Sequence, residues 1–174
     1  MPNITISSNF TDEPIKIPNA VNESAGVNDS GGVDKIITEN ERILLKEILG
    51  DVQYTTLQEE LAKTPFNSGA AQAADQNYVD LVNGSGAYQG LVPMLDNFIF
   101  CAWLEATEIT QTMVSSGKGK TQGFTVADNS SKYVRRWNRF VEEYEAVMDY
   151  IATSDFFEYQ IPDRYYENKN SLDL

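Results

Sequence analysis

The residues best suited to chemistry lie in one short stretch, Ser-Ser-Gly-Lys-Gly-Lys-Thr at 115–121. Its Gly-Lys-Thr ending is that of a phosphate-binding loop, in which backbone N–H groups and a lysine hold the phosphates of a nucleotide. That motif needs a glycine at position 114, where this chain has Val114. It also needs a strand before the loop and a helix directly after it, and the flanking residues predict neither. We therefore interpret 115–121 as a connection between helices and expect no nucleotide or other cofactor there.

Other catalytic and metal-binding groups are sparse. The chain has no histidine and a single cysteine, Cys101, so the commonest general base and the usual zinc ligands are missing. Glu105 and Glu108 stand three residues apart on an expected helix and could pair, but no second pair joins them. Ser115 and Ser116 have no base near them in the sequence. We expect no catalytic or metal site, a protein that is not an enzyme, and a core thiol at Cys101.

Positive charge is concentrated in one part of an acidic chain. The 174 residues carry 13 Lys and Arg against 26 Asp and Glu, a formal net charge of −13. No Lys or Arg occurs from residue 64 to residue 117, and five then follow with only Asp128 among them. The five are the candidate interaction residues, Lys118, Lys120, Lys132, Arg135 and Arg136. They could contact phosphates, or they could meet an acidic patch on another subunit.

The overall acidity limits the classes of partner. A net charge of −13 argues against nucleic-acid binding by the surface as a whole and against binding to anionic membranes. It would suit a surface past which DNA must slide without sticking. The longest apolar run, 98–104, is far shorter than the roughly 20 residues of a membrane span. The first residues do not resemble a signal peptide, so we expect synthesis in the cytoplasm and no membrane partner.

Helices must position these residues. Apolar residues at helical spacing predict five helices, at 38–50, 51–63, 72–82, 90–112 and 130–153. Thr38 with Glu41 forms a capping box, which predicts the start of the first helix, and Gly50 predicts its end in a left-handed conformation. Pro93 is tolerated only in a first turn, so the fourth helix is expected to begin near Gly90.

The two longest helices have different apolar patterns. The middle of 90–112 is apolar nearly all round and includes Trp103, which is typical of a helix buried among others. Residues 130–153 carry a single apolar stripe that contains Trp137, with charged residues on the other faces. The loop 113–129 joins the two helices, and 123–127 have the pattern of a short strand.

These patterns predict a mainly α fold, a small bundle of about five helices between two extended ends. Residues 1–34 are rich in Asn, Ser and Gly and predict an extended N-terminal arm, with a strand-like pattern at 4–7. Residues 35–153 form the helical bundle core. Residues 154–174 form a C-terminal tail with many aromatic rings, which could close the core or dock on a neighbouring molecule.

Three segments, 44–61, 88–104 and 120–144, together resemble a known family. They contain a helix-Leu-Gly-helix sequence, a Tyr-x-Gly-Leu-x-x-Met-Leu sequence opening a buried helix, and a Thr-x-Gly loop before an aromatic amphipathic helix. This arrangement resembles the head–tail connector (adaptor) proteins of tailed bacteriophages that infect Bacteroidetes, crAss-like phages included. The resemblance covers about residues 40–150. It is carried by Gly50, Tyr54, Tyr88, Gly90, Leu91, Met94, Leu95, Gly123 and Trp137.

The resemblance implies a structural virion protein of the phage neck. Such proteins form a homo-oligomeric ring, usually of twelve subunits, below the portal protein, where the ring extends the channel for double-stranded DNA and docks further neck and tail proteins. It implies that loop 113–129 is a docking loop and that DNA passes without sequence-specific binding. The positions expected to have structural roles are Gly50, Gly90, Pro93, Trp103 and Trp137.

Two other hypotheses remain open. The chain could be a small acidic phage-encoded binding or inhibitor protein that acts as a monomer or dimer, with acidic residues spread over one exposed face. It could also be an enzyme whose site is not recognised, which the missing histidine disfavours. The oligomeric state of the purified protein distinguishes the ring subunit from the monomeric binding protein.

Overall fold

The computed structural model describes residues 2–17, 32–114, 126–157 and 166–169, without the side chains of 107–114 and 126–130. Within these ranges the fold is all helical, as predicted, with two isolated bridges and no strand. The helices are η1 (Ser7–Phe10), α1 (Gly32–Glu60), α2 (Gln76–Asn83), α3 (Leu91–Val114) and α4 (Val126–Thr153).

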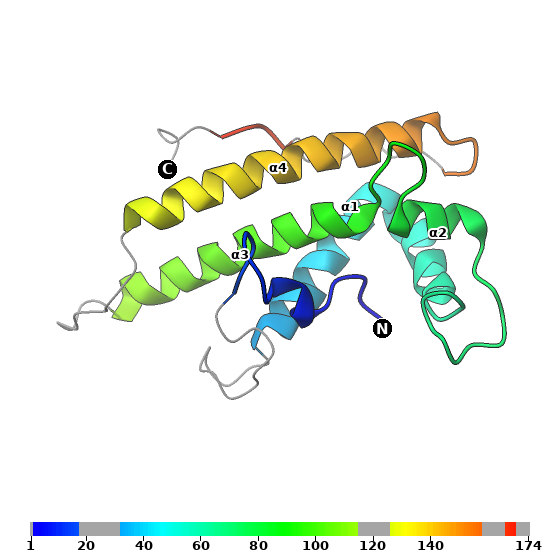
Figure 1. The fold of residues 1–174 in the computed structure, drawn as a ribbon, viewed down its shortest axis with the longest axis horizontal. Helices are drawn as coiled ribbons and strands as arrows, with labels where there is room; N and C mark the ends of the chain where they lie inside the picture. Colours follow the sequence, from blue (N-terminus) through cyan, green and yellow to red (C-terminus); the bar gives the residue numbers. More distant parts are fainter. Residues whose placement is uncertain (1, 18–31, 115–125, 158–165, 170–174) are drawn as a thin grey trace.

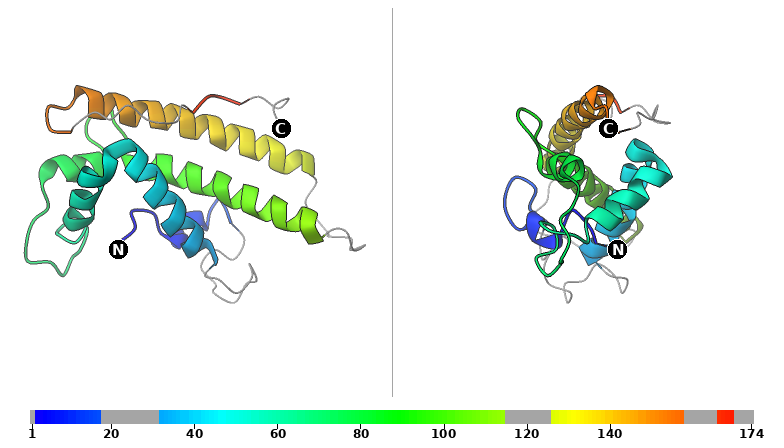
Figure 2. Two further views of the ribbon diagram at one scale, coloured as in Figure 1. Left: turned by 180° about the vertical axis from the view of Figure 1, so that it is seen from behind. Right: turned by 90° about the vertical axis from the view of Figure 1, so that its right-hand side faces the viewer.

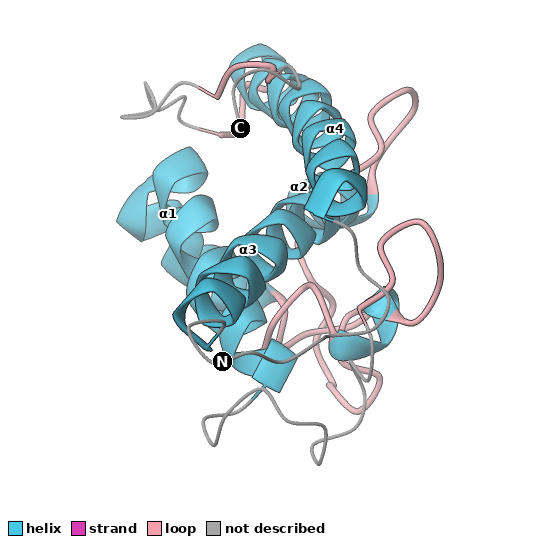
Figure 3. Ribbon diagram, turned by 90° about the vertical axis from the view of Figure 1, so that its left-hand side faces the viewer, coloured by secondary structure: helices cyan, strands magenta, loops and turns pink. Residues whose placement is uncertain are grey.

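The long helices α3 and α4 run antiparallel along the length of the molecule (Figure 1). The first half of α1 packs across α3, and α2 also packs against α3. Viewed along the long axis, α1 and α4 lie on two sides of α3 (Figures 2 and 3). Few direct contacts join α1 to α4, so α3 is the element that holds both. The core consists of their facing apolar side chains, among them Leu44, Leu95 and Phe140.

Gly50 separates two helical segments within α1. Its φ of 72° and ψ of 168° are not helical, and the chain changes direction there. The positive φ agrees with the expectation from the sequence, although ψ is extended rather than left-handed helical. Two of the five predicted helices therefore appear as a single kinked element. The apolar residues Ile43 and Val52 lie 48% and 81% exposed on either side of this kink.

The predicted start of the first helix at Thr38 is wrong. Helix α1 already begins at Gly32, because the buried side chains of Val33 and Ile37 continue its apolar stripe by two further turns. Thr38 and Glu41 do bind donors, but these donors belong to the N-terminal arm. Thr38 Oγ1 accepts from the Asn3 amide at 3.0 Å.

The described part of the N-terminal arm packs on the helices. The expected strand at 4–7 is wrong, because residues 4–6 are irregular and Ser7–Phe10 form the 3-10 helix η1, which contacts α1 and α3. Phe10 and Ile17 are buried, and the Ile17 amide donates to the Phe10 carbonyl at 2.9 Å. Residues 32–34, assigned to the arm from sequence, belong to α1.

Two glycines and a cap fix the boundaries around α2. The helix begins at Gln76, later than expected, because the Asp75 side chain accepts the Asn77 amide at 2.8 Å and caps it. Gly84 ends it, and Gly90 (φ 86°) precedes α3, where Pro93 lies in the first turn as predicted. A Cβ on Gly90 would overlap the Val82 carbonyl oxygen, so this close approach of two backbones requires glycine.

Helices α3 and α4 both extend further into the connection between them than predicted. Helix α3 continues to Val114, and α4 begins at Val126 rather than at residue 130. The predicted strand at 123–127 is therefore wrong for its last two residues, which are helical, and the rest of it lies outside the described residues.

Parts of the C-terminal tail close the core of the same chain. Phe157 is buried, and its ring centroid lies 5.4 Å from that of Tyr78. Tyr166 packs on aromatic rings of α3 and α4. Tyr159 and Tyr165 lie outside the described residues.

Candidate functional site

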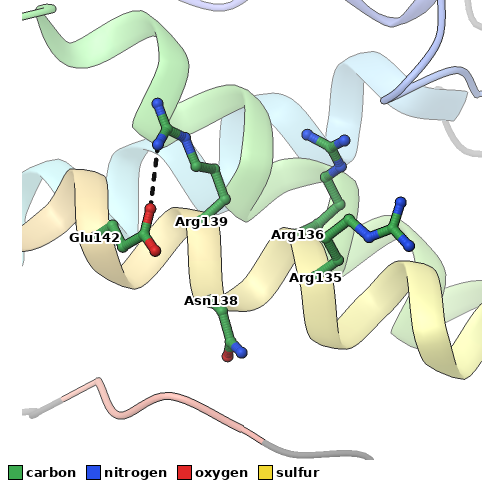
Figure 4. A pocket seen from close by; sticks show the side chains of 5 residues that line it. All are labelled: Arg135, Arg136, Asn138, Arg139 and Glu142. Carbon is green, nitrogen blue, oxygen red and sulfur yellow. Dashed lines mark hydrogen bonds and ion pairs between the residues drawn. The ribbon is translucent and has the colours of Figure 1, made fainter.

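The candidate site is a basic surface on α4. The helix is amphipathic: Tyr133, Phe140 and Tyr144 are buried, and three arginines project together from one side of the helix (Figure 4). We call the set Lys132, Arg135, Arg136 and Arg139 the α4 basic surface. Lys132 precedes Arg135 by three residues and Arg136 precedes Arg139 by three, so each pair lies on neighbouring turns of one face.

Arg139 is held by two carboxylates of its own helix. Its Nε lies 2.8 Å from Glu143 Oε1 and its Nη1 lies 3.1 Å from Glu142 Oε2. Glu143 also accepts the Asn97 amide of α3 at 2.9 Å, so this ion pair is tied to the contact between α3 and α4. The carboxylate of Glu143 raises the pKa of Arg139, whereas burial raises the pKa of Glu143 itself.

Arg136 and Arg135 differ in how firmly they are engaged. Arg136 is half-buried, and its Nη1 donates to Asn97 Oδ1 at 3.5 Å. Its pKa lies below the usual value, first because of burial and then because Arg135 is close. Arg135 is exposed, and among the described residues no carboxylate forms an ion pair with it. Arg135 is thus the guanidinium of the α4 basic surface that is most available to an outside partner.

The arginines border an open depression of about 390 Å³. Its lining consists of Arg135, Arg136, Asn138, Arg139 and Glu142. Figure 4 shows the three arginines projecting from one side of α4, while Asn138 points to the other side, toward the C-terminal segment. An open surface with clustered guanidinium groups suits the carboxylates of a partner protein, because arginine forms bidentate hydrogen bonds with them.

The structure brings together part of the predicted set. Arg135 and Arg136 lie side by side on α4, one turn after Lys132, whereas Lys118, Lys120 and the rest of loop 115–125 lie outside the described residues. Arg139 was missed as a member of the surface. The spacing Arg-Arg-x-x-Arg at 135–139 was a signal for it, since a guanidinium three or four residues further on returns to the same face.

The two tryptophans have different roles in the fold. Trp103 is half-buried on α3, with its ring centroid 5.9 Å from that of Phe100. Trp137 is half-buried on α4, and its indole N–H donates to the backbone carbonyl of Glu167 at 2.8 Å. Trp137 therefore links the helix that carries the basic surface to the C-terminal segment.

The other groups considered from sequence form no recognisable site within the described part of the chain, which leaves out Ser115 and Ser116. Cys101 is buried as predicted, and burial raises its thiol pKa to about 12. Glu105 accepts the Tyr133 hydroxyl at 2.5 Å, and the Glu108 side chain lies outside the description. Among the described residues no cluster of three or more His, Cys, Asp or Glu could hold a metal ion. No helix in the described ranges is long and apolar enough to cross a membrane.

No protein-family model matches the chain, and comparisons with curated proteins and with solved structures give no significant match.

Proposed function

We propose that this chain is a structural subunit of a bacteriophage virion, which assembles with copies of itself into a ring in the neck, below the portal. The ring connects head to tail and extends the DNA channel. The proposal builds on the resemblance of residues 40–150 to head–tail connector proteins. The mainly helical fold and the glycines at helix boundaries, Gly50 and Gly90, agree with that resemblance.

The observation that carries the proposal is the separation of charge. The chain has a net charge of −13, yet α4 presents a cationic surface on which the exposed Arg135 has no ion-pair partner among the described residues. A basic patch on an acidic protein is complementary to the remaining surface of another copy. Complementary charge guides association and fixes orientation, which a ring with one repeated interface requires.

Acidity also agrees with a DNA channel. Channel walls that carry negative charge repel the phosphate backbone, so DNA passes without being gripped. In this proposal the α4 basic surface meets a neighbouring subunit or the portal, and the acidic surfaces remain for the channel and the outside of the ring.

Labelling of virions tests the proposed location. Gold-labelled antibody against the chain is applied to purified particles of the phage that encodes it and viewed by electron microscopy. The proposal expects gold at the vertex where the tail joins the head. Particles that lack the chain, with all of it free in infected cells, would contradict a virion role.

The same net charge favours one alternative, a small acidic inhibitor that acts as a monomer or dimer and imitates nucleic acid. This alternative expects a purified monomer or dimer that binds a basic host protein and is missing from the virion.

A further inference from the structure

Acidic side chains gather at the end of the molecule where α4 ends, away from the α4 basic surface (Figure 1). Helix α2 lies against the residues that follow α4, because the ring of Tyr78 is 5.5 Å from that of Phe156 and 5.4 Å from that of Phe157. Just after α2, Tyr88 stacks on Tyr150 of α4 at 4.2 Å. These contacts bring together carboxylates of two elements. We call them the acidic end, and they are Asp75, Asp80, Asp149 and Asp155.

The negative charge of the acidic end is not balanced by nearby cations. No Lys or Arg occurs in residues 64–117 or 140–163. The aspartates of the acidic end are exposed or half-buried, and among the described residues none of them forms an ion pair. Lys63 lies near this end, since Glu60 accepts the Asp75 amide at 2.7 Å, but Lys63 is paired with Glu60.

An exposed aromatic ring accompanies these carboxylates. Phe156 directly follows Asp155 and is 45% exposed. The pKa of Tyr150 is raised first by burial and then by the charge of Asp80, so this aspartate of α2 lies beside α4. An apolar ring surrounded by charged groups matches the plan of a protein interface, in which the centre is aromatic and the rim is polar.

The two charged surfaces cannot neutralise each other within one copy. Fourteen residues of α4 separate Arg135 from Asp149, which corresponds to about 21 Å along the helix axis. This separation exceeds the Debye length, which is about 8–10 Å at physiological salt. Because both residues lie on one continuous helix, rotation of their side chains does not bring them together. Each surface therefore needs its opposite charge from another molecule.

The stability of α4 itself does not explain the order of its charges. A helix is stabilised by acidic residues near its N-terminus and by basic residues near its C-terminus. The described part of α4 has the reverse order, with cations at 132–139, carboxylates at 142–149 and no basic residue in the last turn. Like charges on neighbouring turns are also unfavourable. An outside partner for each surface accounts for both features.

We propose that copies of this chain associate head to tail, with the α4 basic surface of one copy on the acidic end of the next. This inference rests on the proposed ring and names the two surfaces of its repeated interface. In this contact Arg135 pairs with an exposed aspartate such as Asp149, since a guanidinium binds a carboxylate through two parallel hydrogen bonds. The ring of Phe156 packs against the aliphatic stems of the cations.

The placement of the two surfaces gives the kind of contact that a ring requires. They are different surfaces at different positions along the molecule, so each copy uses one surface toward one neighbour and the other toward the next. Such a heterologous contact repeats from copy to copy and forms a ring when the rotation between copies closes. A two-fold dimer would instead use the same surface on both copies.

Reciprocal charge reversal tests the pairing in the full-length chain. Lys132→Glu/Arg135→Glu reverses the α4 basic surface, and Asp149→Lys/Asp155→Lys reverses the acidic end. Each variant alone should self-associate about a hundredfold more weakly than the wild type, because like charges then face each other. An equal mixture should recover to within about threefold of the wild type, since each reversed surface then meets its complement. Sedimentation equilibrium at low salt measures the apparent dissociation constants.

A control variant changes the same number of charges at another place. Lys16→Glu/Lys35→Glu reverses two exposed cations outside the α4 basic surface. Its mixture with Asp149→Lys/Asp155→Lys should recover no association. Far-ultraviolet circular dichroism checks that every variant is folded, which is expected because the changed residues are exposed, apart from the half-buried Lys132.

The outcomes separate this inference from the ring proposal. If the wild type assembles and the reversed variants assemble equally well, or their mixture stays weak, the head-to-tail pairing is overturned and the ring is not. A wild type that is monomeric at every concentration would overturn both. Normal assembly of Lys132→Glu/Arg135→Glu together with lost binding to the portal would assign the basic surface to the portal and also overturn the pairing.

Discussion

At the scale of single residues, the cations of α4 are not equivalent. Arg139 is engaged by Glu142 and Glu143, and Arg136 faces Asn97, whereas Arg135 is exposed and forms no ion pair with a described carboxylate. The first two therefore stabilise the contact between α3 and α4 as well as the surface. A change at Arg135 tests the surface without disturbing that contact.

Arg135→Glu should weaken self-association about tenfold, which corresponds to about 1.4 kcal/mol. The reason is that the substitution replaces attraction to an acidic partner with repulsion. Sedimentation equilibrium at low salt measures the dissociation constant. Lys35→Glu, an equal charge change on an exposed residue of α1, serves as the control and should have little effect. Equal weakening by both variants would show that only net charge matters.

Glu41 should make stability depend on pH. Its carboxylate is buried and accepts the Ile4 and Thr5 amides at 2.7 and 2.9 Å, and burial raises its pKa from 4.5 to about 7. Asp96, which adds to this rise, has its own pKa raised to about 6 by burial. A pKa higher in the folded state means that the folded protein binds the proton more tightly. The stabilisation is therefore complete below about pH 4.5 and is lost as the pH rises to about 7.

Urea unfolding at about pH 5 and about pH 8 measures this loss, which for Glu41 is about 3 kcal/mol at most. Glu41→Gln carries no titratable group and should lose less stability over the same range. If the wild type and the variant lost the same amount, Glu41 would not be the group responsible.

Gly90→Ala should destabilise the fold by about 2–3 kcal/mol, because the new Cβ overlaps the Val82 carbonyl at a residue with positive φ. Gly86→Ala is a matched control, since Gly86 also has a positive φ but nothing lies within 4 Å of its added Cβ. It should cost only about 1 kcal/mol. Urea unfolding midpoints compare the two variants, and equal losses would refute the close-approach argument.

At the scale of elements, the C-terminal segment bridges helices that otherwise scarcely meet. Tyr166 contacts α1 through Glu47, α3 through Phe98 and α4 through Phe140. Tyr166 therefore links α1 to α4, which make few direct contacts with each other.

Tyr166→Ala should destabilise the protein by about 2 kcal/mol and increase amide hydrogen exchange in α1 near Glu47. Phe156→Ala is the control from the same tail, and it should cost less, because Phe156 is 45% exposed. Urea unfolding measures the loss of stability in both variants, and hydrogen-exchange mass spectrometry measures their amide exchange in α1. Unchanged exchange in α1 after loss of the Tyr166 ring would contradict the bridging role.

Local patterns predicted the elements better than the contacts between them. The stripe through Tyr133, Phe140 and Tyr144 predicted α4, and the conformational freedom of glycine predicted the break at Gly50. The capping box at Thr38 failed because Glu41 binds amides of the N-terminal arm, more than thirty residues away. A contact of that range leaves no local signal.

The candidate site could be predicted only in part, because some of its contacts join residues far apart in the sequence. The clustering of Lys and Arg residues predicted Arg135 and Arg136 as members of the site. The four-residue spacing of Arg139 and Glu143 permits an ion pair within α4, whereas the hydrogen bond from Asn97 of α3 to Glu143 has no local signal in the sequence. The contacts of Tyr166 with Glu47 and of Lys169 with Tyr133 were not predicted, because these residues come together only in the folded chain.

At the scale of the whole molecule, the proposed ring combines three features. The chain is acidic overall, α4 carries a clustered basic surface, and the C-terminal segment binds α4 through Trp137 and Asn138. A monomeric inhibitor would share the acidity but would not need copies of itself. Self-assembly is therefore the property on which the proposed function depends.

Native mass spectrometry of the purified full-length chain over a range of concentrations tests this property most directly. The ring proposal predicts one closed assembly whose mass is a multiple of the 19.5 kDa chain, in keeping with the twelve copies that the resemblance implies. A species of 19.5 kDa at every concentration would contradict it.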